Sequence, residues 1–213
     1  MLIRISNVVH YSIPAMARRN DHTREELITL TLSSVKDFLT EHSYHELSLR
    51  KVANMIGYVP STLVNVFGSY NLLLLHVVAQ TLDELALEAN EVVSQCHDSE
   101  QALYELAYCY HDFAQRNPHR WQLIFEHKMN GEALPEWQAE RIDNMTSMLE
   151  DLLTIFAPQR SPREVLQASR VLWAGVHGIT LLSVDDKFFA DEPIDGKKLI
   201  QNLLSNYLSK WSH

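Results

Sequence analysis

The stretch from Leu47 to Leu75, LSLRKVANMIGYVPSTLVNVFGSYNLLLL, decides the fold. In its first part, apolar residues recur at the i, i+3, i+4 and i+7 spacing of one helix face: Leu49, Val52, Ala53 and Ile56. Gly57 follows directly, and glycine is the residue that most readily ends a helix in the left-handed conformation. Pro60 suits the first turn of a second helix. The inner face of this second helix would carry Leu63, Val66 and Phe67. The stretch therefore predicts two short helices joined by a tight turn.

Two short helices joined in this way form a helix-turn-helix, whose second helix can lie in the major groove of DNA. The outward face of the second helix would carry Ser61, Thr62 and Asn65. Asn65 can read adenine through two hydrogen bonds, and Thr62 can touch a thymine methyl group or a phosphate. The alternative is a pair of purely structural helices in an all-helical bundle.

The predicted recognition helix is poor in cations, because no basic residue occurs between Pro60 and Asn71. Phosphate contacts would then fall to Ser48, Arg50, Lys51 and Tyr70, together with a basic N-terminal arm. The arginines of this arm are Arg18, Arg19 and Arg24. With so few cations, we expect modest DNA affinity and a shallow dependence on salt.

The charge of the chain is unevenly distributed. The formal net charge is −9 at pH 7, yet residues 1–75 carry seven Lys/Arg and six Asp/Glu. The acidic remainder would repel DNA, so DNA contacts are expected in the N-terminal third alone. No apolar run approaches the ~20 residues of a membrane helix, and the first residues lack the apolar core of a secretory signal. We therefore expect a cytoplasmic protein with no membrane partner.

The periodicity along the rest of the chain predicts an all-α protein of about nine helices. Residues 1–20 would be a flexible arm, with Met16 as an alternative start; 21–72 would be a three-helix head and 73–213 a helical body. The other predicted helices run from Thr23 to about His42, from Ser69 to about Cys96, from Asp98 to before Pro118, from Asn117-Pro118 through Phe125, from Pro135 to Ala157, from Ser161 to about Val184, and from about Lys197 to Trp211. An acidic loop, Asp185 to Asp195, would precede the last helix.

The helix that follows Asp98 has two distinct faces. One face is apolar and carries Leu103, Leu106, Ala107, Tyr110 and Ala114. The second carries Tyr104, Tyr108 and His111. We expect core on the apolar side and a cavity or a partner on the aromatic side; simple burial with the hydroxyl groups satisfied is the alternative.

Aromatic and histidine side chains of the body are the candidates for an effector pocket, although stripes of this kind also occur in plain cores. The predicted ligand-binding residues are Tyr104, Tyr108, His111, Trp121, Phe125, Trp173 and His177, and Trp137 shares the same two interpretations. Gly175 and Gly178 indicate close helix packing, either within the monomer or at a dimer seam.

Catalytic and metal motifs are missing from the sequence. The local Cys/His pairs are Cys96 with His97 and Cys109 with His111, and they do not make a tetrahedral ligand set. No glycine-rich phosphate loop, nucleophile elbow or His–Glu zinc motif is present. We expect no catalytic residues, no metal and no cofactor.

The order of these elements resembles the TetR family of bacterial one-component transcription regulators. The residues that carry the resemblance are Leu47-Ser48-Leu49-Arg50-Lys51-Val52-Ala53, Gly57, Thr62-Leu63, Phe67, Ser69 and Leu73. The C-terminal part resembles a subgroup named for a Trp–His–Gly signature, here Trp173, His177 and Gly178, as does Asn117-Pro118 followed by Trp121, Leu123 and Phe125. The chain departs from the family at Val64, where tyrosine is common, and at Tyr70, where lysine is common.

The resemblance implies a homodimer whose two heads reach successive major grooves of a palindromic DNA operator. We accordingly predict a repressor that a small, largely apolar effector releases from double-stranded DNA. The dimer would form through the helices at 162–184 and 197–211. Two alternatives are a ligand-independent DNA-binding or partner-docking protein with a degenerate head, and an all-helical enzyme that uses the Tyr and His side chains of the body.

Overall fold

The computed structural model describes residues 22–185 and 195–211. All regular structure in these two ranges is helical, with nine α-helices, one short 3-10 helix and no strand, which confirms the predicted all-α class. The N-terminal arm and nearly all of the acidic loop lie outside the described residues. Within the described part, no single helix has the length and apolar character of a membrane span; α3 and α4 reach it only as a pair bent by 63°.

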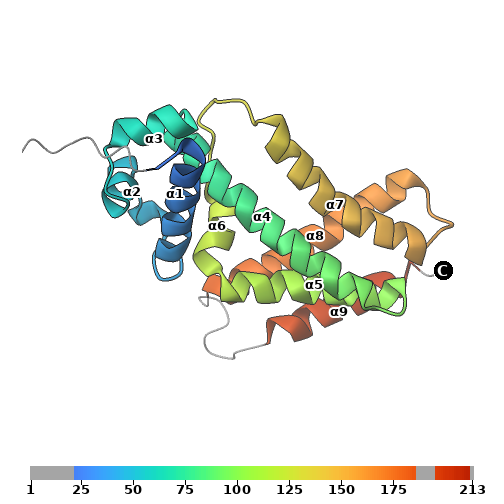
Figure 1. The fold of residues 1–213 in the computed structure, drawn as a ribbon. Helices are drawn as coiled ribbons and strands as arrows, with labels where there is room; N and C mark the ends of the chain where they lie inside the picture. The colour runs from blue at the N-terminus through green and yellow to red at the C-terminus, as the bar shows by residue number, and fades with distance from the viewer. Residues whose placement is uncertain (1–21, 186–194, 212–213) are drawn as a thin grey trace, which may run out of the picture.

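The head consists of α1 (Arg24–Phe38), α2 (Leu49–Met55) and α3 (Pro60–Phe67) (Figure 1). Thr23 and Glu26 form a capping box at the start of α1, where the sequence predicts that this helix begins. Gly57, between α2 and α3, has a φ of +76°, the left-handed conformation expected of a helix stop. The two short helices and the turn between them are therefore present as predicted.

The first helix is shorter than predicted, since it ends at Phe38 instead of about His42. The chain next forms an unpredicted 3-10 helix, Tyr44–Glu46, which Ser43 and Glu46 close with a second capping box. These side chains offer the backbone hydrogen bonds that compete with continuation of the α-helix.

The central side chains of the head core are completely buried. Its fully buried members include Val35, Val52, Ala53, Leu63 and Leu73, each 0 % exposed. The apolar stripes predicted for α2 and α3 meet in this core, with α1 and the start of α4 covering them.

The long helix α4 (Tyr70–Ser94) joins the head to the body. Ser69 caps its first turn, as predicted. Its N-terminal half contributes Leu73 to Val78 to the head core, whereas Leu85 belongs to the body core. Figure 1 shows α4 leaving the head and running across the body without a break.

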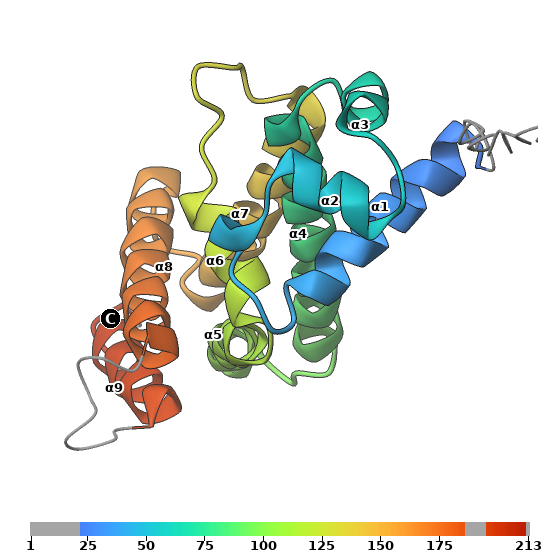
Figure 2. The same cartoon turned by 90° about the vertical axis from the view of Figure 1, so that its left-hand side faces the viewer.

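The body contains α5 (Ser99–Arg116), α6 (Pro118–Glu126), α7 (Glu136–Phe156), α8 (Pro162–Asp185) and α9 (Gly196–Leu208). Helices α8 and α9 pack side by side at one edge of the molecule (Figure 2). A Cβ atom on Gly175 would lie 2.6 Å from a methyl carbon of Leu203, so this glycine permits the close approach of α8 and α9. Gly178 has no neighbour within 4 Å of that position. One of the two glycines thus serves packing within the chain.

Helix α8 is less buried than its sequence predicted. Val171 is 52 % exposed and Trp173 is 43 % exposed, on a helix that is apolar nearly all round after Val171. An apolar helix of this kind is expected to be buried, but Val171 has no described element over it and Trp173 lies at the edge of a cavity. Helix α9 also ends earlier than predicted, at Leu208 instead of Trp211.

Candidate DNA-binding and effector-binding sites

The outer face of the head presents several of the predicted DNA-binding residues. Ser61 and Asn65 are exposed on α3, and Arg50 is exposed on α2, while Thr62 is half-buried. The Ser48 hydroxyl accepts a hydrogen bond from the backbone N–H of Lys51 at 3.2 Å, so it caps α2. The cap satisfies one of the backbone N–H groups at the start of α2 that have no partner within the helix.

The cations of the head are few and mostly engaged. Residues 22–72 contain four Lys/Arg and five Asp/Glu. Arg24 donates to the Val66 carbonyl at 3.0 Å, Lys36 pairs with Glu84 at 2.5 Å, and the Lys51 ammonium lies 4.2 Å from the Phe38 ring centre. Within the described chain, Arg50 is the head cation with no such contact. Its guanidinium is therefore the one best placed to meet a phosphate.

Tyr70 is not placed as a phosphate contact should be. Its hydroxyl oxygen is buried and has no hydrogen-bond partner among the described residues. Burial raises the pKa of this phenol to about 12. Tyr70 instead lines a cleft between head and body with Tyr44 and Glu126, which corrects the sequence prediction. The head also exposes Val59 and Val64, apolar neighbours of the predicted reading residues that the sequence analysis did not single out as contacts.

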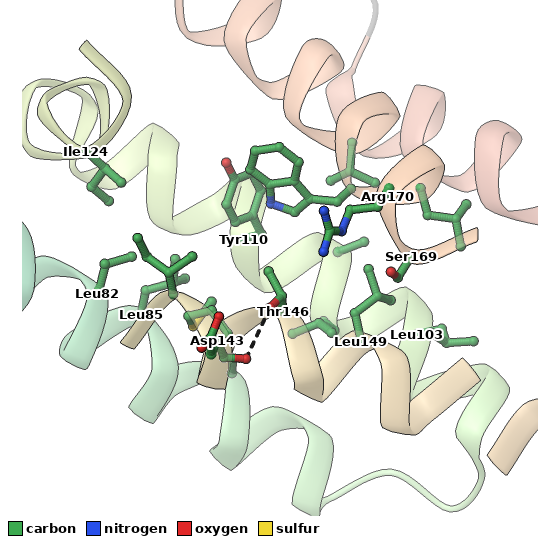
Figure 3. A pocket seen from close by; sticks show the side chains of 18 of the residues that line it. Leu82, Leu85, Leu103, Tyr110, Ile124, Asp143, Thr146, Leu149, Ser169 and Arg170 are labelled. Carbon is green, nitrogen blue, oxygen red and sulfur yellow. Dashed lines mark hydrogen bonds between the residues drawn. The ribbon is translucent and has the colours of Figure 1, made fainter. Parts of the chain in front are cut away.

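The body encloses a cavity of about 430 Å³ between α4, α5, α7 and α8, with contributions from α6 and α9 (Figure 3). Most of its lining is apolar: Leu82, Leu85, Ala89, Leu103, Leu106, Ala107, Tyr110, Ile124, Phe125, Ile142, Met145, Leu149, Leu172, Trp173, Val176 and Leu204. A volume in this range with mainly apolar walls is typical of small-molecule sites.

The cavity has a closed end and an open mouth. Leu103 and Leu172, at 1 % exposure each, belong to the closed end. Phe125, Ile142 and Trp173 are 39 to 43 % exposed, and they form the mouth on α6, α7 and α8. A ligand can therefore enter between α7 and α8.

Five polar residues complete the lining: Gln138, Asp143, Thr146, Ser169 and Arg170. The Thr146 hydroxyl donates to the Asp143 carbonyl at 3.1 Å, and the Ser169 hydroxyl donates to the Leu166 carbonyl at 3.0 Å. Gln138 is 2 % exposed, and its side-chain oxygen has no partner among the described residues. The lining thus holds one unsatisfied buried amide and two charged groups near the mouth.

An aromatic cluster closes one side of the cavity. The Tyr110 hydroxyl and Nδ1 of His177 share a hydrogen bond of 2.7 Å. The His177 ring stacks on Trp173 with centroids 5.2 Å apart and meets the edge of Phe125 at 4.4 Å. Burial lowers the pKa of His177, which favours a neutral ring, and it raises the pKa of Tyr110. The neutral imidazole fixes the orientation of the Tyr110 hydroxyl.

The structure brings together only part of the predicted effector site. Phe125 and Trp173 line the cavity, and Trp121 and His177 stand behind them in the aromatic cluster. Tyr104, Tyr108 and His111 do not line it. The Tyr108 ring lies beneath Lys197 of α9, and Nδ1 of His111 lies 3.3 Å from the Thr180 hydroxyl.

The cavity therefore lies on the opposite face of α5 from the one predicted. Its lining uses the apolar residues Leu103, Leu106, Ala107 and Tyr110. An apolar stripe looks the same in a sequence whether it faces a filled core or an empty apolar cavity, so Tyr110 was missed. Arg170 and Gln138 were missed because nothing in the sequence brings α7 against α8.

Trp137 lies at the boundary between head and body instead of lining the cavity. Its ring stacks on His76 of α4, with centroids 4.8 Å apart and an interplanar angle of 10°. His76 in turn meets the edge of Phe67, the last residue of α3, at 5.6 Å. Trp137 is followed directly by Gln138 of the cavity. A packed path therefore connects the cavity wall to the end of α3.

The described residues thus form a helical protein of two parts. One continuous helix, α4, joins a helix-turn-helix head to a helical body that contains a cavity. Residues 103–207 match the family described as "Tetracyclin repressor-like, C-terminal domain". None of the curated proteins compared with the chain matches it. The Trp–His–Gly subgroup is not tested by these matches and stays a prediction.

Solved structures of low sequence identity share the fold. A protein of unknown function from Rhodococcus sp. RHA1 is 16 % identical, with a TM-score of 0.75 over 92 % of this chain and 100 % of that one. The TetR family transcriptional regulator PfmR from Thermus thermophilus is 17 % identical, with a TM-score of 0.60 over 84 % and 97 %. AibR, solved with isovaleryl coenzyme A and operator DNA, is 12 % identical, with a TM-score of 0.58 over 84 % and 96 %. The chain thus has the fold of a TetR-like transcriptional regulator.

Proposed function

We propose that this protein is a DNA-binding transcription regulator, a homodimeric repressor that a small, largely apolar effector releases from a palindromic operator. The observation that carries the proposal is the double role of α4. Its first half is part of the head core, and Leu82, Leu85 and Ala89 in its second half line the cavity. A ligand that prefers one position of α4 must also favour one position of the head.

The DNA contacts would come from α3 and from the start of α2. Asn65 and Ser61 would face base edges, with Thr62 beside them, while Arg50 and the N-terminal ends of the helices would contact phosphates. Exposed Val59 and Val64 suit thymine methyl groups. We therefore propose that much of the specificity comes from A·T pairs.

The dimer would form through the outer faces of α8 and α9. Val171 is the most exposed large apolar residue of α8, and the outer face of α9 carries uncharged polar side chains such as Gln201, Asn202 and Ser205. A Val171→Glu variant should then sediment as a monomer at concentrations where the parent is a dimer. Leu203 is a poorer test of this seam, because it packs against Gly175 within the chain.

The neighbour AibR was solved with both a small ligand and operator DNA. This precedent supports, for the present chain, a fold that accommodates both ligands at once. The lining of the cavity in this chain determines which effector can bind.

The test is selection of a binding site from randomised duplex DNA by the full-length protein, followed by fluorescence anisotropy over a salt series. We expect a palindromic site. Asn65→Ala should cost about 1–3 kcal/mol at one base position. Arg50→Ala should weaken binding to all DNA sequences alike. It should also reduce the slope of log affinity against log salt concentration by about 2 for a dimer, one for each head. Asn144→Ala, an exposed change on α7 outside the proposed DNA-binding and dimer faces, is the matched control and should leave both quantities unchanged.

The cation-poor head favours a second candidate function, a protein-docking module with a degenerate helix-turn-helix. Four Lys/Arg against five Asp/Glu in residues 22–72 is an unfavourable balance for binding a polyanion. No enrichment of any DNA site by a folded dimer would support this candidate and contradict the regulator.

A further inference from the structure

The cavity wall limits the kind of effector that can bind, provided that the proposed effector role is correct. Its volume of about 430 Å³ equals roughly 14 water molecules at about 30 Å³ each. A ligand of about a dozen non-hydrogen atoms therefore fits. Because the closed end is formed by leucine, alanine and valine side chains, the part of the ligand that enters first must be apolar.

The two charged residues of the cavity lining, Asp143 and Arg170, are exposed and lie at the mouth of the cavity. Arg170 lies on α8 between Ser169 and the Trp173 turn, and its guanidinium reaches over the cavity towards α7 (Figure 3). No carboxylate of the described residues forms an ion pair with it. Arg160, at the start of the same helix, pairs with Glu164, and Arg141 of α7 pairs with Asp83. The Arg170 guanidinium thus presents several hydrogen-bond donors beside an apolar cavity, and no carboxylate of the described residues pairs with it.

A guanidinium in this position suits a planar acid, since its N–H groups match the two oxygens of a carboxylate. The hydroxyl groups of Thr146 and Ser169 already donate to backbone carbonyls, so they do not compete with Arg170 as donors to a carboxylate. Asp143 of α7 is the one acidic residue of the lining, exposed and not paired with Arg170. It is the residue that would favour an amine instead.

We infer that the cavity binds a monoanionic amphipathic molecule, with an apolar chain or ring system in the closed end and a carboxylate on Arg170 at the mouth. Arg170 is then the residue that determines specificity between acids and neutral or cationic molecules of the same shape. The aromatic cluster supplies the apolar side wall, and Tyr110 faces the ligand from α5.

The experiment compares three probes of equal length: decanoate, decan-1-ol and decylamine. Their affinities for the full-length protein are measured at neutral pH by calorimetry and by tryptophan fluorescence, since Trp173 lies at the mouth. We expect decanoate to bind about tenfold more tightly than the alcohol, the difference that a charge-assisted pair at a partly exposed site can supply. Decylamine should bind most weakly.

Variants of two arginines on α8 sharpen the result. Arg170→Gln should reduce decanoate to the affinity of the alcohol, and Arg170→Lys should keep most of the preference. Arg163→Gln, an exposed change on the same helix that does not line the cavity, should change nothing. Asp143→Asn should leave the preference for the acid in place.

Several outcomes would overturn the inference: tightest binding of decylamine, a preference for the acid that survives in Arg170→Gln, or no binding of any probe. Because these measurements contain no DNA, they separate the inference from the proposed function. A protein that selects an operator but binds none of the probes remains a DNA-binding protein with a different or absent effector. If the protein binds decanoate through Arg170 but selects no DNA, the inferred ligand site is supported and the proposed regulator function is contradicted.

Discussion

The two halves of α4 pack against very different surroundings. Apolar residues between Leu73 and Val78 belong to the head core, where the central side chains are completely buried. One turn beyond, Leu82 and Leu85 border a cavity of about 430 Å³. Protein interiors are normally packed as densely as organic crystals. The proposed ligand site therefore rests on this contrast between empty apolar volume and a full core along one helix.

A polar contact separates these two surroundings. Glu84 of α4 accepts from Lys36 of α1 at 2.5 Å and from Arg120 of α6 at 2.8 Å. Arg120 is 6 % exposed, so its charge depends on this carboxylate. This partly buried ionic contact and the aromatic stack at Trp137 are two of the connections between head and body; an ion pair between His45 and Glu126 is a third. In the proposed mechanism, a change in the cavity would reach the head through contacts of this kind.

The largest effect should come from truncation of the head core. Leu63→Ala removes a side chain that is 0 % exposed at the centre of the helix-turn-helix. We expect it to lower the free energy of unfolding by about 3 kcal/mol, since a cavity must form in a full core. The equivalent change in the body, Leu106→Ala, enlarges a cavity that already exists and removes fewer contacts, so about 1–2 kcal/mol is expected. Chemical denaturation of both variants measures the difference. Equal losses would contradict the contrast between a full and an open core.

The next effect should come from Glu84→Gln, which leaves the Arg120 guanidinium buried without its counter-charge. Breaking a buried pair costs several kcal/mol, but Glu84 is about one-third exposed, so we expect about 2 kcal/mol at neutral pH. Glu88→Gln, one turn along α4, breaks a more exposed pair with Arg116 and should cost under about 1 kcal/mol.

The same pair gives a pH dependence with a definite sign. Burial alone would raise the pKa of Glu84, but the hydrogen bonds from Lys36 and Arg120 lower it overall below 4.5. The unfolded chain then takes up a proton first as the pH falls, so the stabilisation is present above pH 4.5 and is lost below it. The difference in stability between the parent and Glu84→Gln should therefore shrink as the pH falls below 4.5. A difference that stays constant through that window would show that folding does not lower the pKa of Glu84.

The sequence predicted the head far better than the cavity, for physical reasons. The start of α1 at Thr23, the glycine stop after Ile56 and the apolar stripes of α2 and α3 are local features, and each was found where the residues predicted it. The cavity depends on how α5, α7 and α8 pack across the body, which no local spacing specifies. Phe125 and Trp173 were predicted because large aromatic residues are conspicuous, while Arg170 and Gln138 acquire their roles from tertiary contacts alone.

The smallest predicted effect concerns the aromatic connection, and a double-mutant cycle isolates it. We expect His76→Ala and Trp137→Ala to be coupled by about 1 kcal/mol, the value typical of a packed aromatic pair. Phe38 and His42 provide the control cycle. Their ring centroids are 4.5 Å apart, but the two residues are only four positions apart in the head, and the side chain of His42 is 47 % exposed. Its coupling should be smaller.

The two stacks differ in what they join. The pair at residues 38 and 42 stabilises one end of a single helix, whereas His76 and Trp137 hold α7 against α4 directly beside the cavity. Burial, together with the charge of Arg141, lowers the pKa of His76, so the ring is neutral at pH 7 and stacks without a charge to desolvate. A coupling near zero between His76 and Trp137 would mean that this stack does not hold α7 against α4. The ion pair between Arg141 and Asp83 would then be the contact that joins the two helices beside the cavity.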